Sequence, residues 1–244
     1  MKKLIWLLLL PKTIYSQKTI QLDRPDQTET VAIVPKNYLQ EEAGFILEKS
    51  KNSEVDYLLP SILWKYGLNN IVELRLLTEF KLNLPNNQYS YQLQPIAIGL
   101  KSHLIDEKGA IPSISFIGEA EITKNNVSGK KMLIPSFRFT LQNTITKNMS
   151  LGYNLGIEWN EEMQETYIYT LTIGQSITKK INYYLEIYGF LNPYKTADHR
   201  IDGGFTYLIN NDFMIDISSG IGLSKISISH YYSLGISYRL KLNK

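Results

Sequence analysis

Residues 227–240 read Ser-Ile-Ser-His-Tyr-Tyr-Ser-Leu-Gly-Ile-Ser-Tyr-Arg-Leu and alternate between two kinds of side chain. The set that begins at Ile228 is apolar and aromatic, whereas the set that begins at Ser227 is small and polar and ends in Arg239. A period of two indicates a β-strand whose faces meet different surroundings. Strands of globular domains run about five or six residues, but a strand that crosses a bilayer needs roughly 9–11 and its emerging ends. The stretch therefore predicts the closing strand of a transmembrane β-barrel.

The same alternation recurs along the chain between short polar breaks. Strands are expected at residues 38–49, 55–66, 71–80, 91–104, 111–122, 132–145, 149–159, 166–177, 182–191, 200–209, 213–223 and 227–240. The breaks that follow even-numbered strands are short, which suits tight hairpins and a periplasmic N-terminus. We predict an all-β fold, an antiparallel up-and-down transmembrane barrel of about 12 strands over residues 38–244. A soluble β-sandwich or lipocalin-like cup is the alternative, and the polar faces, rich in Gly, Ser and Thr, disfavour it.

The N-terminus has the three regions of a secretory signal peptide. It begins Met1-Lys2-Lys3, continues with an apolar run over residues 4–10 and reaches a small residue at Ser16. The apolar run is shorter than the roughly 20 residues that a membrane-spanning helix needs. We predict a signal peptide over residues 1–16 and localisation in the cell outer membrane; a buried N-terminal strand or helix is the alternative.

The composition excludes several classes of protein. The chain has no cysteine, so it forms no disulfide, and its net charge of +3 is too small to indicate a nucleic-acid partner. Its three histidines, His103, His199 and His230, belong to no Gly-x-Ser-x-Gly, His-Glu-x-x-His or glycine-rich phosphate motif. We therefore expect no enzyme, no catalytic residue, no metal site and no cofactor. A membrane-embedded hydrolase, in which Ser and His converge in space, is the least favoured alternative.

Charged side chains on the polar faces are expected to line the lumen, because an Arg or Lys facing lipid at the bilayer midplane costs about 2–4 kcal/mol. The predicted lumen-lining residues are Glu73, Arg75, Glu79, Glu119, Arg138, Glu158, Glu186, Arg200, Asp202, Asp216 and Arg239. They form either a charged lining that sets permeability or binds a solute, or a salt-bridged network that fills a closed barrel.

Residues 17–37 separate the signal peptide from the first strand and do not read as a strand. The segment contains many charged residues and a proline, a combination that is not needed in a solvated tail. We predict that it folds into the barrel mouth as a plug or gate and that Arg24 pairs with a lumen carboxylate. The plug or gate residues are Asp23, Arg24, Pro25, Asp26 and Glu29. A periplasmic tail is the alternative.

Two stretches carry resemblances. The pattern Ser233-x-Gly235-x-x-Tyr238-x-Leu240 resembles the assembly signal of outer-membrane barrels, although residues 241–244 extend beyond it. It implies two partners, the barrel-assembly machinery and outer-membrane lipid. Residues 22–30 and 34–45 closely resemble the "TDRPDQTES…VPKGxxQxExGF" opening of a family of outer-membrane barrels, labelled transporters or assigned to a MetA pathway of phenol degradation.

The family resemblance implies a transmembrane barrel for uptake of small apolar or aromatic compounds. Leu22 and Asn37 depart from the family pattern, which has Thr and Gly there. Asn tolerates the left-handed backbone conformation, so the turn before the first strand is expected to survive. The expected function is a porin-like transport channel for passive passage of a small solute, hydrophobic or aromatic. A non-transporting structural or ligand-binding barrel is the alternative.

Overall fold

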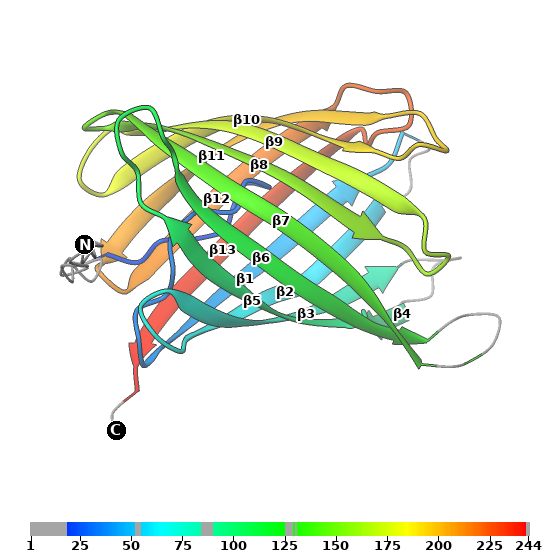
Figure 1. Ribbon diagram of the computed structural model, residues 1–244. Coiled ribbons are helices and arrows are strands. Elements are labelled where there is room, and N and C mark those ends of the chain that lie inside the picture. The colour runs from blue at the N-terminus through cyan, green and yellow to red at the C-terminus, as the bar shows by residue number, and fades with distance from the viewer. Residues whose placement is uncertain (1–18, 52–54, 84–89, 125–128, 130, 243–244) are drawn as a thin grey trace, which may run out of the picture.

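The computed structural model describes residues 19–51, 55–83, 90–124, 129 and 131–242, and the predicted signal peptide lies outside these ranges. Its strands are β1 (Tyr38–Lys49), β2 (Val55–Gly67), β3 (Val72–Asn83), β4 (Ser90–Leu93), β5 (Ile96–Ile105), β6 (Ser113–Lys124), β7 (Lys131–Thr146), β8 (Met149–Trp159), β9 (Glu165–Ser176), β10 (Ile181–Leu191), β11 (Asp198–Asn210), β12 (Phe213–Gly222) and β13 (His230–Lys241). Neighbouring strands pair antiparallel in chain order, except that β4 and β5 both pair with β3. Because β1 pairs with both β2 and β13, the sheet closes into a barrel (Figure 1).

The barrel has twelve strand positions because β4 and β5 share one of them. The C-terminal end of β3 pairs with β4, and the N-terminal half of β3 pairs with β5. Pro95, which has no N–H to donate, lies in the gap between β4 and β5, where Gln94 N donates to Glu79 O at 2.8 Å. The prediction of an up-and-down barrel of about 12 strands is confirmed, but the strand expected over 91–104 is interrupted at this proline.

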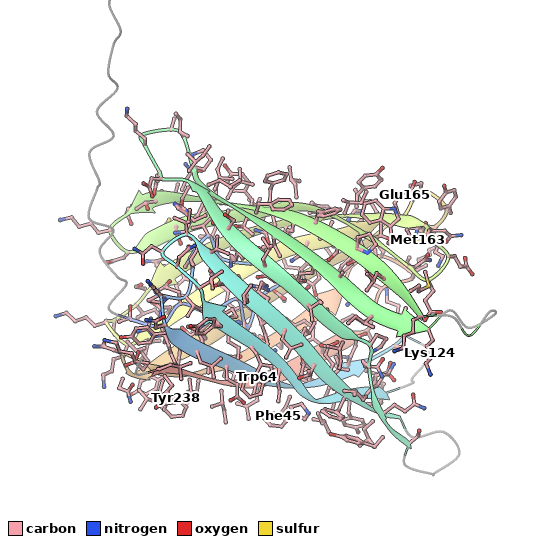
Figure 2. The ribbon with its side chains drawn as sticks, turned by 60° about the horizontal axis from the view of Figure 1, so that its bottom comes forward. Phe45, Trp64, Lys124, Met163, Glu165 and Tyr238 are labelled. Atoms are coloured by element: carbon pink, nitrogen blue, oxygen red, sulfur yellow. The ribbon has the colours of Figure 1, made fainter. Side chains whose placement is uncertain are left out.

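The closing strand shows the two faces that its sequence predicts. Tyr232, Leu234, Ile236 and Tyr238 point away from the barrel and are 43–58% exposed, whereas Arg239 and the serines between them are buried inside. Figure 2 shows Phe45, Trp64 and Tyr238 on the outer surface. This apolar outer surface is the one that would face lipid.

The strand begins three residues later than the alternation predicts. Residues Ser227–Ser229 belong to the connection after β12, and Ile228, expected on the outer face, is only 6% exposed. Ser227 N donates to Ser224 O at 3.2 Å, so the backbone turns here even though the side chains keep alternating. Periodicity alone therefore extended the prediction through a turn.

The two ends of the barrel differ. β1 begins and β13 ends at one rim of the barrel, called the terminal rim here (Figure 1). Connections at this rim include the short ones 147–148 and 211–212 and the longer 106–112, whereas the opposite loop rim carries 160–164, 192–197 and 223–229. Outer-membrane barrels have their shorter turns on the periplasmic side, and the periplasmic N-terminus stays a prediction. Among the described residues, no helix is long and apolar enough to cross a membrane.

Residues 19–37, called the inner segment here, run inside the barrel before β1 begins (Figure 1, dark blue). The segment ends at Asn37, whose φ of 63° is left-handed, as the comparison of Asn with Gly at this position led us to expect. Asn37 N donates to Gly67 O at 2.9 Å, which fixes the turn from the inner segment into β1.

Candidate functional site

The inner segment is attached at both of its ends near the terminal rim. At its start, Ile20 N donates to Asn211 O at 2.8 Å, and the buried side chains of Ile20 and Leu22 pack against Met214. Near its end, Val34 N donates to Glu73 Oε2 at 2.8 Å. The residues between these two points cross the lumen.

Asp23 is held by cations from three strands. Its carboxylate lies 2.8 Å from Lys65 Nζ on β2, Arg75 Nη1 on β3 and Lys101 Nζ on β5. All four side chains are at most 2% exposed. Burial alone would raise the pKa of Asp23, but the positive charges of Lys101, Lys65 and Arg75 outweigh it and hold the pKa well below its usual range. Asp23 is therefore ionised and attaches the inner segment to this wall.

The same wall carries further carboxylates that partly neutralise these cations. Glu42 pairs with Lys65 and also accepts hydrogen bonds from Asp23 N at 2.9 Å and Arg24 N at 3.1 Å. Arg75 binds Glu29 with two contacts of 2.8 and 2.9 Å and reaches Glu119 at 2.7 Å. Lys101 differs, because apart from Asp23 its described carboxylate partner is Glu29 at 3.9 Å. Lys101 therefore depends on Asp23 most strongly.

The inner segment also reaches the wall formed by β8, β9 and β10. Gln27 N donates to Glu186 Oε2 at 2.7 Å, and the hydroxyl of Thr28 contacts both Glu186 and Thr170, the latter at 2.6 Å. Glu29 N donates to Asn154 Oδ1 at 2.7 Å, and Asn154 Nδ2 returns a hydrogen bond to Glu29 O at 3.1 Å. Because Glu29 also binds Arg75 on β3, the segment joins two walls of the barrel rather than lying along one.

Arg24 contacts a third part of the wall. Its Nη2 donates to Ser233 Oγ at 2.7 Å and lies 3.6 Å from Asp216 Oδ1. The structure thus places a lumen carboxylate beside Arg24.

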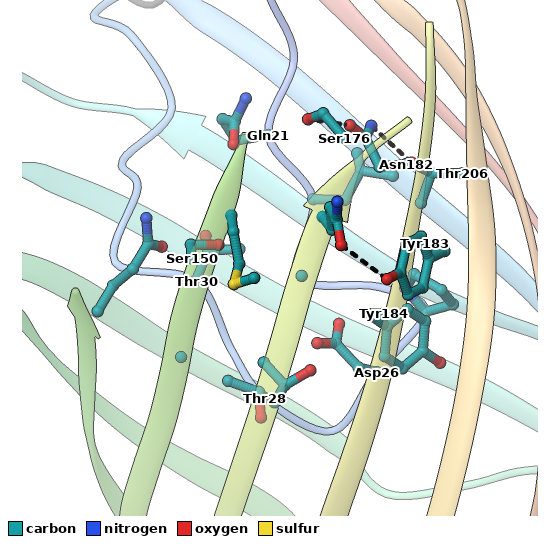
Figure 3. Close-up of a pocket in the computed structure, with 18 of the residues that line it drawn as sticks. Gln21, Asp26, Thr28, Thr30, Ser150, Ser176, Asn182, Tyr183, Tyr184 and Thr206 are labelled. Atoms are coloured by element: carbon teal, nitrogen blue, oxygen red, sulfur yellow. Dashed lines mark hydrogen bonds between the residues drawn. The ribbon is translucent and has the colours of Figure 1, made fainter. Parts of the chain in front are cut away.

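A pocket of about 420 Å³ lies between the inner segment and the wall formed by β7–β12, toward the terminal rim (Figure 3). Leu22, Asp26 and Thr28 contribute to it from the inner segment, and Tyr184 and Met214 contribute from the wall. The carboxyl group of Asp26 faces Glu186 and Asp202, and burial together with these negative charges raises the pKa of Asp26 well above its ordinary value. Burial also raises the pKa of Glu29 to about 7, against the attraction of Arg75.

The predicted lumen-lining residues do not form one site. Glu73, Arg75, Glu186, Asp202 and Asp216 are buried around the inner segment. Glu79, Glu119, Arg138 and Glu158 are partly exposed nearer the loop rim, where Arg138 Nη1 still reaches Gln27 O at 3.0 Å. Arg200 lies farther from the inner segment and pairs with Asp198 at 2.7 Å and Glu48 at 3.5 Å. Arg239 pairs with Asp212 at the terminal rim, and its Nη2 donates to Asn211 O at 3.4 Å, the carbonyl that also accepts from Ile20 N.

All five predicted plug residues lie in the segment that crosses the lumen, and Pro25 lines the pocket beside Asp26. The structure adds four residues to the site that were not predicted from the sequence: Gln40, Glu42, Lys65 and Lys101. The signal was present in the alternation, since these residues occupy the non-lipid faces of β1, β2 and β5.

His103 lies between a serine and a carboxylate, at 3.2 Å from Ser115 Oγ and 3.0 Å from Asp106 Oδ1. Ser115 is fully buried and donates its hydroxyl hydrogen to Val31 O at 2.7 Å, so its oxygen is not presented to a substrate. His199 bonds to Tyr169 at 2.7 Å and His230 to Ser229 at 3.2 Å. Within the described ranges, no group of three or more His, Cys, Asp or Glu residues is arranged to hold a metal ion.

Similar solved structures are outer-membrane barrels. The NanC porin aligns with a TM-score of 0.59 at 10% identity, covering 83% of this chain and all of the porin chain. The KdgM porin aligns with a TM-score of 0.56 at 12% identity, covering 82% of this chain and 98% of the porin chain. At these identities the likeness shows the fold. Comparison with curated protein sequences finds no match.

A family model described as "Putative MetA-pathway of phenol degradation" matches residues 22–240, which include the inner segment from Leu22 onward and nearly all of the barrel. The match begins at Leu22, where the stretch that resembles the opening of this family also begins. The chain therefore belongs to the family described as the MetA pathway of phenol degradation.

Proposed function

We propose that this protein is an outer-membrane channel for passive passage of a small solute and that the inner segment is its gate. One observation carries the proposal: residues 23–29 hold Lys65, Arg75 and Lys101 on one wall and Asn154, Thr170 and Glu186 on another. A segment fixed in this way crosses the lumen, so a solute can pass only when it moves.

The charges around the gate bear on the class of solute. Five carboxylates, those of Asp23, Glu29, Glu42, Glu73 and Glu119, surround three cations on the β2, β3 and β5 side. On the opposite side, Glu186, Asp202 and Asp216 add further acidic groups. An excess of carboxylates disfavours anionic solutes. This arrangement supports an uncharged solute, and the phenol degradation in the family description makes small aromatic compounds the first class to test.

The gate model is tested by single-channel conductance of the refolded mature protein in a planar bilayer, with gel mobility of boiled and unboiled samples as the folding control. We expect low and infrequent conductance for the natural sequence and large, steady conductance after deletion of Asp23–Thr30. A deletion variant that folds and conducts no more than the natural protein would contradict the gate.

A non-transporting structural or ligand-binding barrel is the second candidate, since the inner segment also fills the lumen as a polar network. It predicts that the natural protein never conducts, with or without a solute, whereas deletion of the segment would open the lumen under either candidate. Solute-loaded liposomes test the class of solute. Because phenol crosses lipid unaided, release is compared with that from protein-free liposomes, and a channel for uncharged aromatics should accelerate the release of phenol but not of a benzoate-like anion of the same size.

A further inference from the structure

We propose that the wall beside Arg24 is a binding site for a guanidinium or primary ammonium group and that Arg24 is its internal occupant. The site is called the cation slot here and consists of Gly44, Asp216, Ser218, Ser233, Gly235 and Ser237. The binding itself stands apart from the proposed function. Its consequence for gating rests on the proposed function, because Arg24 belongs to the segment that closes the lumen.

The floor of the cation slot is a row of positions without side chains. Gly44 on β1 pairs with Gly235 on β13, and Gly235 pairs with Asp216 on β12. A side-chain carbon at Gly44 would overlap the guanidinium of Arg24, and one at Gly235 would overlap the carboxylate of Asp216. Two adjacent glycines therefore leave space for a flat group next to an acidic side chain.

The slot contains more hydrogen-bond acceptors than Arg24 uses. Asp216 is 1% exposed, and neither of its carboxylate oxygens accepts a hydrogen bond from any described residue. Arg24 Nη2 lies 3.6 Å away, which is outside hydrogen-bond distance. The hydroxyl oxygens of Ser218 and Ser237 are buried nearby, also without a partner among the described residues. Buried polar groups are normally paired, so these atoms indicate room for a better-fitting ligand.

The charge of the slot selects a cation. Asp216 is the acidic group of the slot, and Arg24 is the cation that pairs with it in the described part of the chain. Once Arg24 leaves, a buried carboxylate remains that needs a positive partner. A guanidinium can bind a carboxylate with two parallel hydrogen bonds, which Arg24 does not achieve here. Arg24 lines the pocket of about 420 Å³, whereas the slot residues behind it do not, so a small organic cation in this pocket reaches the slot once Arg24 leaves.

Competition at this slot would free one attachment of the inner segment. A solute cation bound to Asp216 displaces Arg24, while Asp23 keeps its own contacts with Lys65, Arg75 and Lys101. The cation therefore weakens the closed state without removing it. The ligand class is a small compound with a guanidinium or primary ammonium group.

The test uses methylguanidinium and the Arg24→Ala variant of the mature protein, refolded in detergent and checked by heat-modifiable gel mobility. Isothermal titration calorimetry is expected to show one bound methylguanidinium in Arg24→Ala and at least tenfold weaker binding in the natural protein, where Arg24 occupies the slot. Adding Asp216→Asn should abolish the binding. The matched change Asp212→Asn, at the terminal rim, should leave it intact.

A second variant guards against misfolding of Asp216→Asn. Gly235→Ala, combined with Arg24→Ala, fills the floor of the slot and is also expected to abolish binding. A folded Arg24→Ala protein that binds no methylguanidinium would overturn the proposal, as would binding that survives Asp216→Asn or Gly235→Ala. Conductance is recorded separately, on the natural protein at a methylguanidinium concentration that saturates the slot: binding without any rise in conductance would refute the part of Arg24 in closing the channel and leave the slot standing.

Discussion

Replacing Asp23 by Asn removes the charge that attaches the inner segment to the basic wall. Three buried cations lie 2.8 Å from this carboxylate. Lys65 would retain Glu42, and Arg75 would retain Glu29 and Glu119. Lys101, which is 0% exposed, would retain only the contact of 3.9 Å with Glu29 among the described carboxylates. The change therefore leaves one buried cation without a close partner.

Leaving a buried charge unpaired costs about 3–5 kcal/mol. Because about 1.4 kcal/mol corresponds to a factor of ten, the ratio of closed to open channel should fall by between about 10² and 10⁴. The barrel itself should fold normally, since Asp23 lies outside every strand. The cost arises mainly in the closed state, where solvent does not reach Lys101.

Single-channel recording of Asp23→Asn in a planar bilayer measures this change as open probability. Asp212→Asn serves as the matched control, because it removes a carboxylate of the same size from the terminal rim, where Asp212 pairs with Arg239. The control should conduct as the natural protein does. A heat-modifiable, folded Asp23→Asn protein whose open probability equals that of the control would refute the reasoning.

Three further predictions concern the gate and the outer surface. Glu29 and Asp26 have raised pKa values in the closed channel, Glu29 to about 7 from 4.5, so the closed channel retains protons that an open segment would release. The open probability should therefore rise with pH between 5 and 7, by up to about tenfold per pH unit for each group. A flat pH profile in bilayer recordings would contradict this. The lowered pKa of Asp23 acts oppositely, but only below its ordinary value of 3.8. Thr28→Val removes a hydroxyl that contacts Glu186 and Thr170, which should weaken closure by about 1–3 kcal/mol and raise conductance. The control Thr178→Val, at the terminal rim, should leave conductance unchanged. Leu155→Arg places a charge at an outward position whose side chain is 61% exposed. Urea titration in lipid vesicles should show that the free energy of unfolding falls by about 2–4 kcal/mol if that face meets lipid, and does not fall if it meets water.

The strands were predictable because their signal is local. Each residue's partner on the other face is its neighbour in sequence, so alternation along β1 or β8 reports the two environments directly. The same property explains the errors. At Ser227–Ser229 the alternation continues through a turn, and within 91–104 it passes over Pro95, where the backbone stops pairing. Neither event changes the sequence of polar and apolar side chains.

The partners of the inner segment were not predictable in the same way. Asp23 meets cations that lie 42, 52 and 78 positions away along the chain, on three different strands. Lys65 and Lys101 occupy polar faces, but the local sequence pattern is the same whether such a lysine meets water or a buried carboxylate. The charged, proline-containing stretch around Asp23 indicated a segment with a role in the lumen, and only closure of the barrel shows which residues surround it.

A reversible cross-link between the inner segment and the wall tests the central claim, that this segment closes the lumen. The hydroxyl oxygens of Thr28 and Thr170 are 2.6 Å apart, close to the sulfur–sulfur distance of about 2.05 Å in a disulfide. Because the chain has no cysteine, Thr28→Cys and Thr170→Cys would create a single pair. In a protein that also carries Asp23→Asn, we predict low conductance when this pair is oxidised and a large increase when a reductant is added. Equal conductance before and after reduction, with the cross-link verified on a gel, would contradict the account.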